Sequence, residues 1–288
     1  MVAVLLACAS AVLFGGMTVA LRLALRRSTD AALATLATVV PALAVAVGVA
    51  AVEAGRPGPL GVQDTWPFLL AGLLAPGASQ ILFTLAVREA GPSRTSVAVG
   101  TAPLVSVAIA LALLGEPARP PLLGGAALIV AGGIALIGEQ GRPEHVRVIG
   151  IAYAALATLL FASRDNLLRH LAERGEAPRA GAAAAATLLT GTVIALVWQL
   201  AAGSGVRNYR AWLAFVPAGL CFGLSYVLLF EAYYRSRVTV VAPLVASESL
   251  WGVLLSVLLL RRTELVGRRL LAGAALVVAG GALIGVFR

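Results

Sequence analysis

The nonapeptide Gly125-Ala-Ala-Leu-Ile-Val-Ala-Gly-Gly133 returns near the end of the chain as Gly273-Ala-Ala-Leu-Val-Val-Ala-Gly-Gly281, with one substitution. The two copies lie 148 residues apart, about half of the 288 residues, and a glutamate precedes each at the same offset, Glu116 and Glu264. A second echo, residues 14–22 against 161–169, falls at a shift of 147. These matches indicate a tandem duplication, which we divide into residues 1–143 and 144–288.

The composition excludes an ordinary soluble domain. The chain is 60% hydrophobic and 12% charged, with a mean hydropathy of +0.96, and long apolar runs follow one another with short polar breaks. The net charge of +9 comes from arginines at the ends of these runs. We interpret them as topology signals and lipid-headgroup contacts and expect no nucleic-acid partner. The two cysteines, Cys8 and Cys221, lie inside apolar runs without disulfide or metal spacing.

The runs predict an all-α membrane protein with ten transmembrane helices and no soluble domain. The expected spans are Val2–Leu25, Ala31–Val52, Trp66–Val87, Ser93–Leu114, Pro121–Gly138, Ile149–Leu168, Ala180–Ala202, Ala211–Tyr234, Val238–Leu260 and Leu265–Val286. Pro41, Pro76, Pro103 and Pro243 fall inside spans 2, 3, 4 and 9, where each removes a backbone hydrogen bond and can bend the helix.

The odd number of spans in each repeat determines the symmetry that we expect. Ten spans divide into five and five, and a repeat with an odd number of spans ends on the opposite side from its start. We therefore expect two inverted five-helix repeats. Thirteen arginines, Arg22 and Arg94 among them, follow the odd-numbered spans and eight flank the other side, so the positive-inside rule places both termini outside.

Several of these features resemble a known family. Pro103, Gly115-Glu116 and the glycine-rich residues 125–138, with the counterparts Glu264 and residues 273–285, resemble the ten-helix proteins of the drug/metabolite transporter superfamily that carry two EamA repeats. Trp251 stands where Pro103 would map, and Arg262-Thr263 replaces the usual Leu-Gly before Glu264. The resemblance implies a transporter with both termini in the cytoplasm, against the arginine count.

Glu248 is the first candidate site residue, because it lies about eleven residues into span 9. At ~1.5 Å per residue that depth is roughly 15 Å, and an ionised group at mid-bilayer costs roughly 2.5–3.5 kcal/mol. Ser247, Ser249 and Trp251 would add a polar and aromatic wall. Glu248 could contact substrate or couple transport to protons; alternatively, it is a protonated glutamate bonded to a neighbouring helix.

Arg164 in span 6 is the second candidate. It could pair with Glu248 or Glu231, or bind an anionic group of a substrate; alternatively, it reaches the membrane surface from near the end of its span. Asp165 could satisfy Arg169, one turn later. Glu231 could act in the site or belong to an interfacial belt beside Tyr233 and Tyr234.

The first repeat carries neutral residues at the equivalent positions, Met17 for Arg164, Thr84 for Glu231 and Gly100 for Glu248. We therefore expect an asymmetric pocket. Its first-half contributors would be Gln80 and Thr101, each with helix–helix hydrogen bonding as the alternative. Tyr226 and Trp251 could line the pocket or serve packing.

The motif glutamates Glu116 and Glu264 sit at span ends, where capping of spans 5 and 10 is the better reading. The small residues of those spans, including Ala127, Ala131, Gly281 and Gly285, would form a packing surface or a homodimer contact.

The function expected from these features is secondary transport of a small polar metabolite such as an amino acid, most plausibly export, with protons as a coupling ion and lipids as surroundings. A lipid-linked metabolite translocase and a non-transporting receptor or scaffold are the alternatives. No nucleotide-binding motif, metal cluster or catalytic pair is present in the sequence, so we expect no enzyme, cofactor or metal. The expected location is a bacterial cytoplasmic membrane.

Overall fold

The computed structural model describes residues 2–55, 62–102, 104–105, 108, 120–137, 148–173, 178–203, 209–236, 241, 244–260 and 267–287. All regular secondary structure in this part of the chain is helical. Six helices there are long and apolar enough to cross a membrane: Val2–Leu25, Ala31–Ala54, Trp66–Ala90, Val148–Leu168, Ala180–Ala201 and Val216–Arg235. Two shorter apolar helices accompany them, Leu123–Gly132 and Leu244–Leu259.

The helices follow the predicted spans closely where those spans are uninterrupted apolar runs. They are α1 (Val2–Leu25), α2 (Ala31–Ala54), α3 (Trp66–Gly72), α4 (Ser79–Ala90), α5 (Pro92–Val99), α7 (Pro120–Ile137), α8 (Val148–Glu173), α9 (Ala180–Ala201), α10 (Tyr209–Ala214), α11 (Val216–Arg235), α13 (Glu248–Leu259) and α14 (Arg268–Phe287). The short segments η1 (Val62–Thr65) and η2 (Leu73–Ala78) flank α3. The predicted eighth span is divided at Phe215 between α10 and α11.

The third predicted span is not one straight helix. A π-helical segment, η2, separates α3 from α4, and Ala75 within it has extended backbone angles (φ −145°, ψ 124°) before Pro76. The break is the one expected from an internal proline. Helix α9 packs closely on it, because a Cβ at Gly191 would lie 2.4 Å from Pro76 Cγ. By contrast, α2 continues through Pro41, and Pro103 and Pro243 lie outside the described residues.

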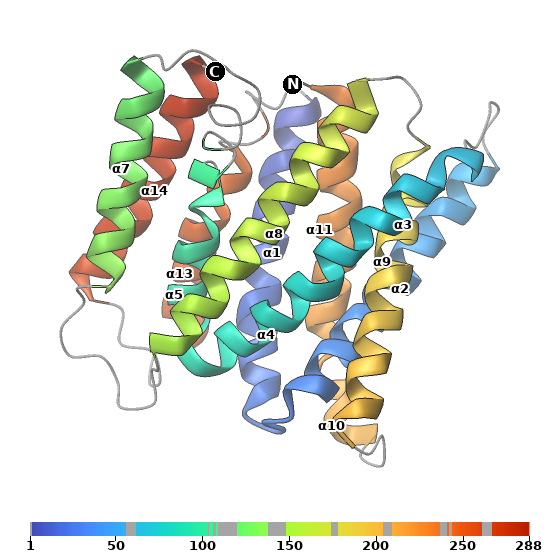
Figure 1. Ribbon diagram of the computed structural model, residues 1–288. Helices are drawn as coiled ribbons and strands as arrows, with labels where there is room; N and C mark the ends of the chain where they lie inside the picture. The colour runs from blue at the N-terminus through green and yellow to red at the C-terminus, as the bar shows by residue number, and fades with distance from the viewer. Residues whose placement is uncertain are drawn as a thin grey trace.

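The helices pair across the two halves of the sequence. Helix α1 packs on α11 and α4 on α8, while α2 contacts α9, α5 contacts α13, and α7 contacts α14. If the two halves are exchanged, the α1–α11 contact becomes the α8–α4 contact. Each of the last three contacts joins equivalent spans of the two halves, so the exchange leaves it between the same two spans. Both termini lie at the same edge of the molecule (Figure 1). The contacts therefore have the pattern of a two-fold relation between the halves.

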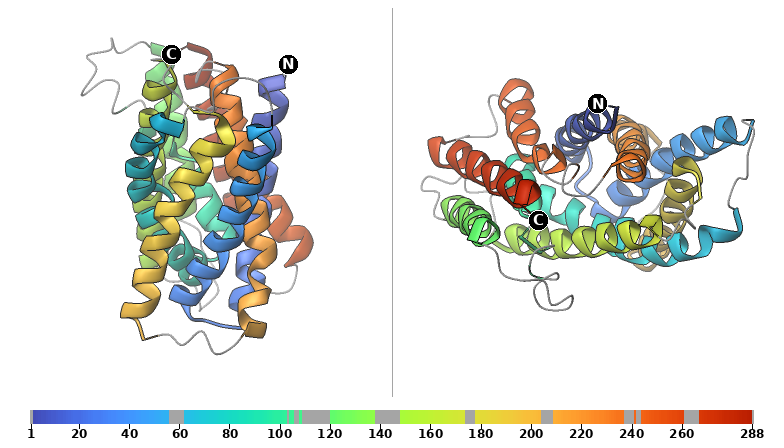
Figure 2. Two further views of the ribbon diagram at one scale, coloured as in Figure 1. Left: turned by 90° about the vertical axis from the view of Figure 1, so that its right-hand side faces the viewer. Right: turned by 90° about the horizontal axis from the view of Figure 1, so that it is seen from above.

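Helices α7 and α14 form a unit at one end of an elongated assembly (Figure 2). They cross at glycines: a Cβ at Gly280 would lie 2.5 Å from Gly125 O, and one at Gly132 would lie 2.7 Å from Gly273 O. Close backbone approach of this kind is how small residues hold membrane helices together. The packing role expected for these spans is thus confirmed within one chain, whereas contact between two chains stays a prediction.

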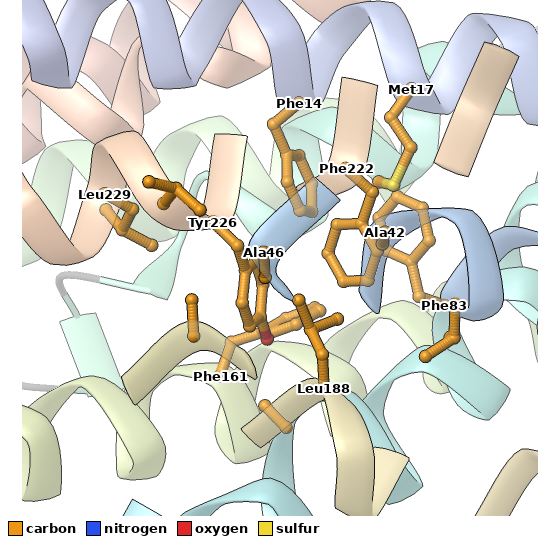
Figure 3. Packing of buried hydrophobic residues seen from close by; sticks show 14 of the residues in the cluster. Phe14, Met17, Ala42, Ala46, Phe83, Phe161, Leu188, Phe222, Tyr226 and Leu229 are labelled. Atoms are coloured by element: carbon orange, nitrogen blue, oxygen red, sulfur yellow. The ribbon is translucent and has the colours of Figure 1, made fainter. Parts of the chain in front are cut away.

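Aromatic rings fill the middle of the bundle (Figure 3). Phe14 of α1 meets Phe83 of α4 at a centroid distance of 5.3 Å, Phe161 of α8 at 6.0 Å and Phe222 of α11 at 6.3 Å. All three contacts are edge-to-face, the favoured geometry for such rings. Four helices from both halves are therefore joined at one aromatic cluster.

Candidate functional site

Arg164 of α8 is buried in the interior, with 2% of its surface exposed. Its guanidinium carbon lies 4.6 Å from the centre of the Tyr226 ring and 5.6 Å from that of Phe230, both on α11. Contacts of this kind contribute about 0.5–2 kcal/mol, most when desolvated. Of the two alternatives for Arg164, burial in the bundle is therefore the one that the structure has, and not extension to the membrane surface. Helix α8 extends to Glu173, five residues beyond the predicted end of the span at Leu168, and the side chain turns inward to the aromatic rings.

Asp165 is the acidic neighbour of this arginine. Its Oδ1 lies 2.8 Å from Arg164 Nε, yet neither atom has a hydrogen-bond partner, and neither does Arg164 Nη1. The charges are close, but the geometry between Nε and Oδ1 is not that of a hydrogen bond. Because a buried donor without a partner costs about 1–3 kcal/mol, Arg164 retains capacity to bind an oxyanion. The predicted ion pairs of Arg164 with Glu248 or Glu231 do not form, and the side chain of Arg169 lies outside the described residues.

Two further polar side chains are buried without partners. The Tyr226 hydroxyl has none, and neither the nitrogen nor the oxygen of the Gln80 amide has one; Gln80 is fully buried on α4. The helix–helix hydrogen bond considered for Gln80 is thus not formed. Membrane-buried polar groups are normally satisfied by protein or water, so these atoms mark places where a polar ligand would be favourable.

Glu248 lies at the start of α13 and is buried, with 8% of its surface exposed. Prediction placed it in the middle of a continuous helix over 238–260. Helix lies on both sides of it: residues 244–246 are helical, Ser247 is a turn residue with helical backbone angles (φ −64°, ψ −12°), and α13 continues from Glu248. Glu248 is close enough to Arg164 and Asp165 to interact electrostatically with both.

Helix α13 is held at this place by close contact with α5. A Cβ at Gly252 would lie 1.9 Å from Ser96 Oγ, and one at Gly100 would lie 2.7 Å from Ser249 Cβ. Regular α5 ends at Val99, with Gly100 as its C-cap. Gly100 is the position equivalent to Glu248 in the first repeat, and a turn at residues 100–101 interrupts the helix there as the turn at Ser247 does in the second repeat.

The other predicted site residues are engaged locally. Thr101 Oγ1 donates to Ala98 O at 2.6 Å, and Ser247 Oγ donates to Leu244 O at 2.5 Å. Trp251 is half-buried, and its backbone approaches α1 at Gly15. Glu231 accepts a 2.6 Å hydrogen bond from Arg235 Nε at the exposed end of α11. Of the predicted set, Arg164 and Tyr226 touch directly and Glu248 lies near them.

Arg94 is a buried residue that the sequence did not reveal. It was counted among the loop arginines, but it lies in α5 with 1% of its surface exposed. Arg22 was counted in the same way, and its Nη1 donates to Arg88 O at 3.0 Å. Proximity to a span end was the only signal available, and it does not show which way a side chain turns. The arginine count therefore overstated the charge that faces water.

Two grooves lie at the helix ends, away from the buried cluster. One, of about 520 Å³, is bordered by the end of α1 and the start of α11, with Arg26 and Arg27 in its wall. The other, of about 310 Å³, is bordered by the end of α8 and the start of α3, with Asp64 and His170 in its wall. They occupy equivalent places, since Leu23 and Ala24 line the first where His170 and Leu171 line the second.

The motif glutamates Glu116 and Glu264 lie outside the described residues. Among the residues that are described, no three His, Cys, Asp or Glu side chains come together to hold a metal ion.

Comparison with known proteins adds to this geometry. A family model described as the EamA-like transporter family matches residues 1–138 and again residues 148–286. No curated protein matches the chain. Fifteen chains of solved structures do, including a crystal structure of a protein with 20% sequence identity and a TM-score of 0.70, in a match that covers 98% of this chain and 95% of the other. At that identity the likeness establishes the fold alone.

Proposed function

The chain belongs to the EamA-like transporter family, and on that premise we propose that it is a secondary-active transporter, an exporter of small polar metabolites such as amino acids. The family match and the long apolar helices together identify it as an integral membrane protein. The proposed route runs between the two halves of the chain, which form ten crossings in two inverted repeats. Both termini at one edge (Figure 1) support an even number of crossings.

The observation that carries the proposal is the buried polar cluster of Arg164, Asp165, Tyr226 and Glu248. It brings one cation and two carboxylates into an apolar bundle, where Nε and Nη1 of Arg164 and the Tyr226 hydroxyl have no hydrogen-bond partner. Such groups are expensive in a membrane and mark substrate or ion pathways. A zwitterion suits the cluster, because its carboxylate would satisfy Arg164 while its ammonium group faces Glu248.

Alternating access follows from the two-fold pattern of helix contacts. If each half can adopt the conformation of the other, the cluster is exposed to one side of the membrane and then to the other. Gln80 and Thr101 are the proposed contributions of the first half. Glu231, bound to Arg235, is the least central of the proposed residues.

Glu248 is the proposed proton-coupling group. It is buried, has neither a hydrogen bond nor an ion pair among the described residues, and lies close to a cation that a substrate carboxylate would engage. Proton release from Glu248 and substrate binding at Arg164 would therefore influence each other through their charges.

The test is transport by the purified protein in liposomes, with a mixture of radiolabelled proteinogenic amino acids as the probe. We expect uptake that increases when a pH gradient is imposed. Glu248→Gln should transport without responding to the gradient, whereas Arg164→Gln should lose transport. A Glu89→Gln variant serves as the matched control, because it removes a carboxylate that lies outside the cluster, beside Arg88 at the end of α4.

Two results would count against the proposal. Full gradient dependence in Glu248→Gln would remove the coupling role of that residue. Absence of uptake for every amino acid, with folded protein in the liposomes, would remove amino acids as the substrate class.

A further inference from the structure

The central aromatic cluster contains residues that the repeat makes equivalent. A shift of 147 relates Phe14 of α1 to Phe161 of α8, and the same shift relates Leu82-Phe83 of α4 to Leu229-Phe230 of α11. The last pair lies in helices whose terminal arginines, Arg88 and Arg235, also match. Phe14 and Phe161 thus form a pair between the repeats. Phe83 and Phe230 are candidates for equivalent positions beside this pair.

The two candidates do not occupy equivalent places in this structure. The ring of Phe83 lies against both members of the pair, 5.3 Å from Phe14 and 6.2 Å from Phe161. The ring of Phe230 instead lies 5.7 Å from Tyr226 and 6.3 Å from Phe68. Among the described residues it makes no ring contact with the pair. The halves therefore differ at this point, although their sequences match there.

A physical reason for the difference lies in the neighbouring residues. The guanidinium of Arg164 lies over Tyr226 and, at 5.6 Å, over Phe230. In the first repeat, Met17 replaces the arginine and Ser79 replaces the tyrosine. Phe83 therefore has no cation to hold it away from the pair, whereas Phe230 has one.

The two phenylalanines also lie toward opposite edges of the molecule. Phe83 is in the later part of the Trp66–Ala90 span and Phe230 is in the later part of α11, and these helices end at opposite edges (Figure 1). The groove of about 310 Å³ lies on the Phe230 side, since Phe68 belongs to its wall. The groove of about 520 Å³ lies at the other edge, where α1 ends beside α4, so the two edges differ in the ring contact made by Phe83 and not in the presence of a groove.

We propose that Phe83 and Phe230 are alternating gates, each closing one side of the pathway by packing on the Phe14–Phe161 pair, and that Arg164 holds Phe230 away from the pair in the present state. This inference rests on the alternating access of the proposed function. In the opposite state Phe230 packs on the pair and Phe83 leaves it. A substrate oxyanion that draws the guanidinium off the ring releases the Phe230 gate, so that binding and gating share one residue.

Crosslinking tests the gates without a substrate. In a Cys8→Ala/Cys221→Ala background, Phe83→Cys/Phe161→Cys reports the present contact, and the repeat-equivalent Phe230→Cys/Phe14→Cys reports the opposite one. A short bifunctional thiol reagent should join both pairs in membranes, the first more readily. Because the second pair replaces Phe230 itself, the effect of Arg164→Met, which installs the residue of the other repeat, is measured in variants that keep this ring.

A second measurement uses single cysteines, so that it does not depend on the folding of the double variants. Single Thr84→Cys and Glu231→Cys variants place a thiol beside each gate at equivalent positions. A membrane-impermeant maleimide should label residue 231 faster than residue 84, and Arg164→Met should narrow or reverse that order.

The outcomes separate this inference from the proposed function. If Phe230→Cys/Phe14→Cys never crosslinks and Arg164→Met leaves the labelling of residues 84 and 231 unchanged, the gates are refuted even where amino-acid uptake is observed. If both crosslinks form and the labelling responds to Arg164→Met but no amino acid is transported, the gates stand and the substrate class fails.

Discussion

Gly252→Ala is expected to destabilise the protein at the crossing of α5 and α13. The added Cβ would lie 1.9 Å from Ser96 Oγ and 2.4 Å from Ser96 Cβ. Rotating the serine hydroxyl removes the first clash, but the second involves an atom fixed to the backbone. The helices must therefore separate by about 1 Å, and overpacking of this kind costs about 1–3 kcal/mol.

The assay is thermal unfolding of the detergent-purified protein, followed by the fluorescence of its four tryptophans. The cost corresponds to a decrease in Tm of several degrees. Gly48→Ala is the matched control, because nothing lies within 4 Å of the added Cβ. In a helix interior that change should stabilise by roughly 0.5–1 kcal/mol.

A double variant locates the effect. Ser96→Gly removes the atoms that the new methyl group meets, so Ser96→Gly/Gly252→Ala should be more stable than the sum of the single variants predicts. If Gly252→Ala behaves like Gly48→Ala, or if the double variant shows no coupling, the close contact between α5 and α13 is refuted. The placement of Glu248 would lose its support with it.

Three further changes test other contacts. Asp30→Ala removes the side chain that accepts hydrogen bonds from Ala32 N at 3.0 Å and Leu33 N at 3.1 Å; it should cost about 0.5–2 kcal/mol, and Asp30→Asn should melt close to the parent. Gly280→Ala should lower Tm, because its Cβ would lie 2.5 Å from Gly125 O, whereas Gly124→Ala meets its nearest atom at 3.5 Å and should not; equal melting of the two would contradict the α7–α14 crossing. Tyr226→Phe keeps the ring beside Arg164 and should unfold at a higher temperature than Tyr226→Leu, by the equivalent of about 0.5–2 kcal/mol; identical melting would show that the ring does not stabilise the cation.

Where local rules decide the structure, the sequence predicted it well. Helix α1 begins and ends at the predicted residues, Val2 and Leu25, because an apolar run ends there at charged residues. The Asp30 cap of α2 follows from the same kind of local signal, an acidic residue before an apolar run, although it was not among the predictions. The break before Pro76 follows from the missing backbone donor. These features depend on a few neighbouring residues, which a sequence shows directly.

Features that depend on distant residues were predicted in part. The sequence nominated Arg164 and Tyr226 separately, but their contact depends on how α8 packs against α11. It placed Glu248 within a span, but it did not show the turn at Ser247 that precedes this residue in the helix. Arg94 was missed because burial near a helix end is decided by tertiary packing. In each case the sequence showed the type of residue but not the direction in which its side chain points.

The serine contact between α1 and α11 has a consequence for how such a protein can be divided. Ser10 Oγ donates to Ser225 O at 2.9 Å, and Ser225 Oγ donates to Ser10 O at 3.0 Å, both inside the bundle. This reciprocal link ties a helix of the first repeat to one of the second, and α4 with α8 forms the corresponding pair. In the proposed alternating access, the bodies that move against each other would therefore combine helices of both repeats. Two halves produced as separate chains would have to assemble with each other to form these helix pairs, so neither repeat is a complete unit by itself.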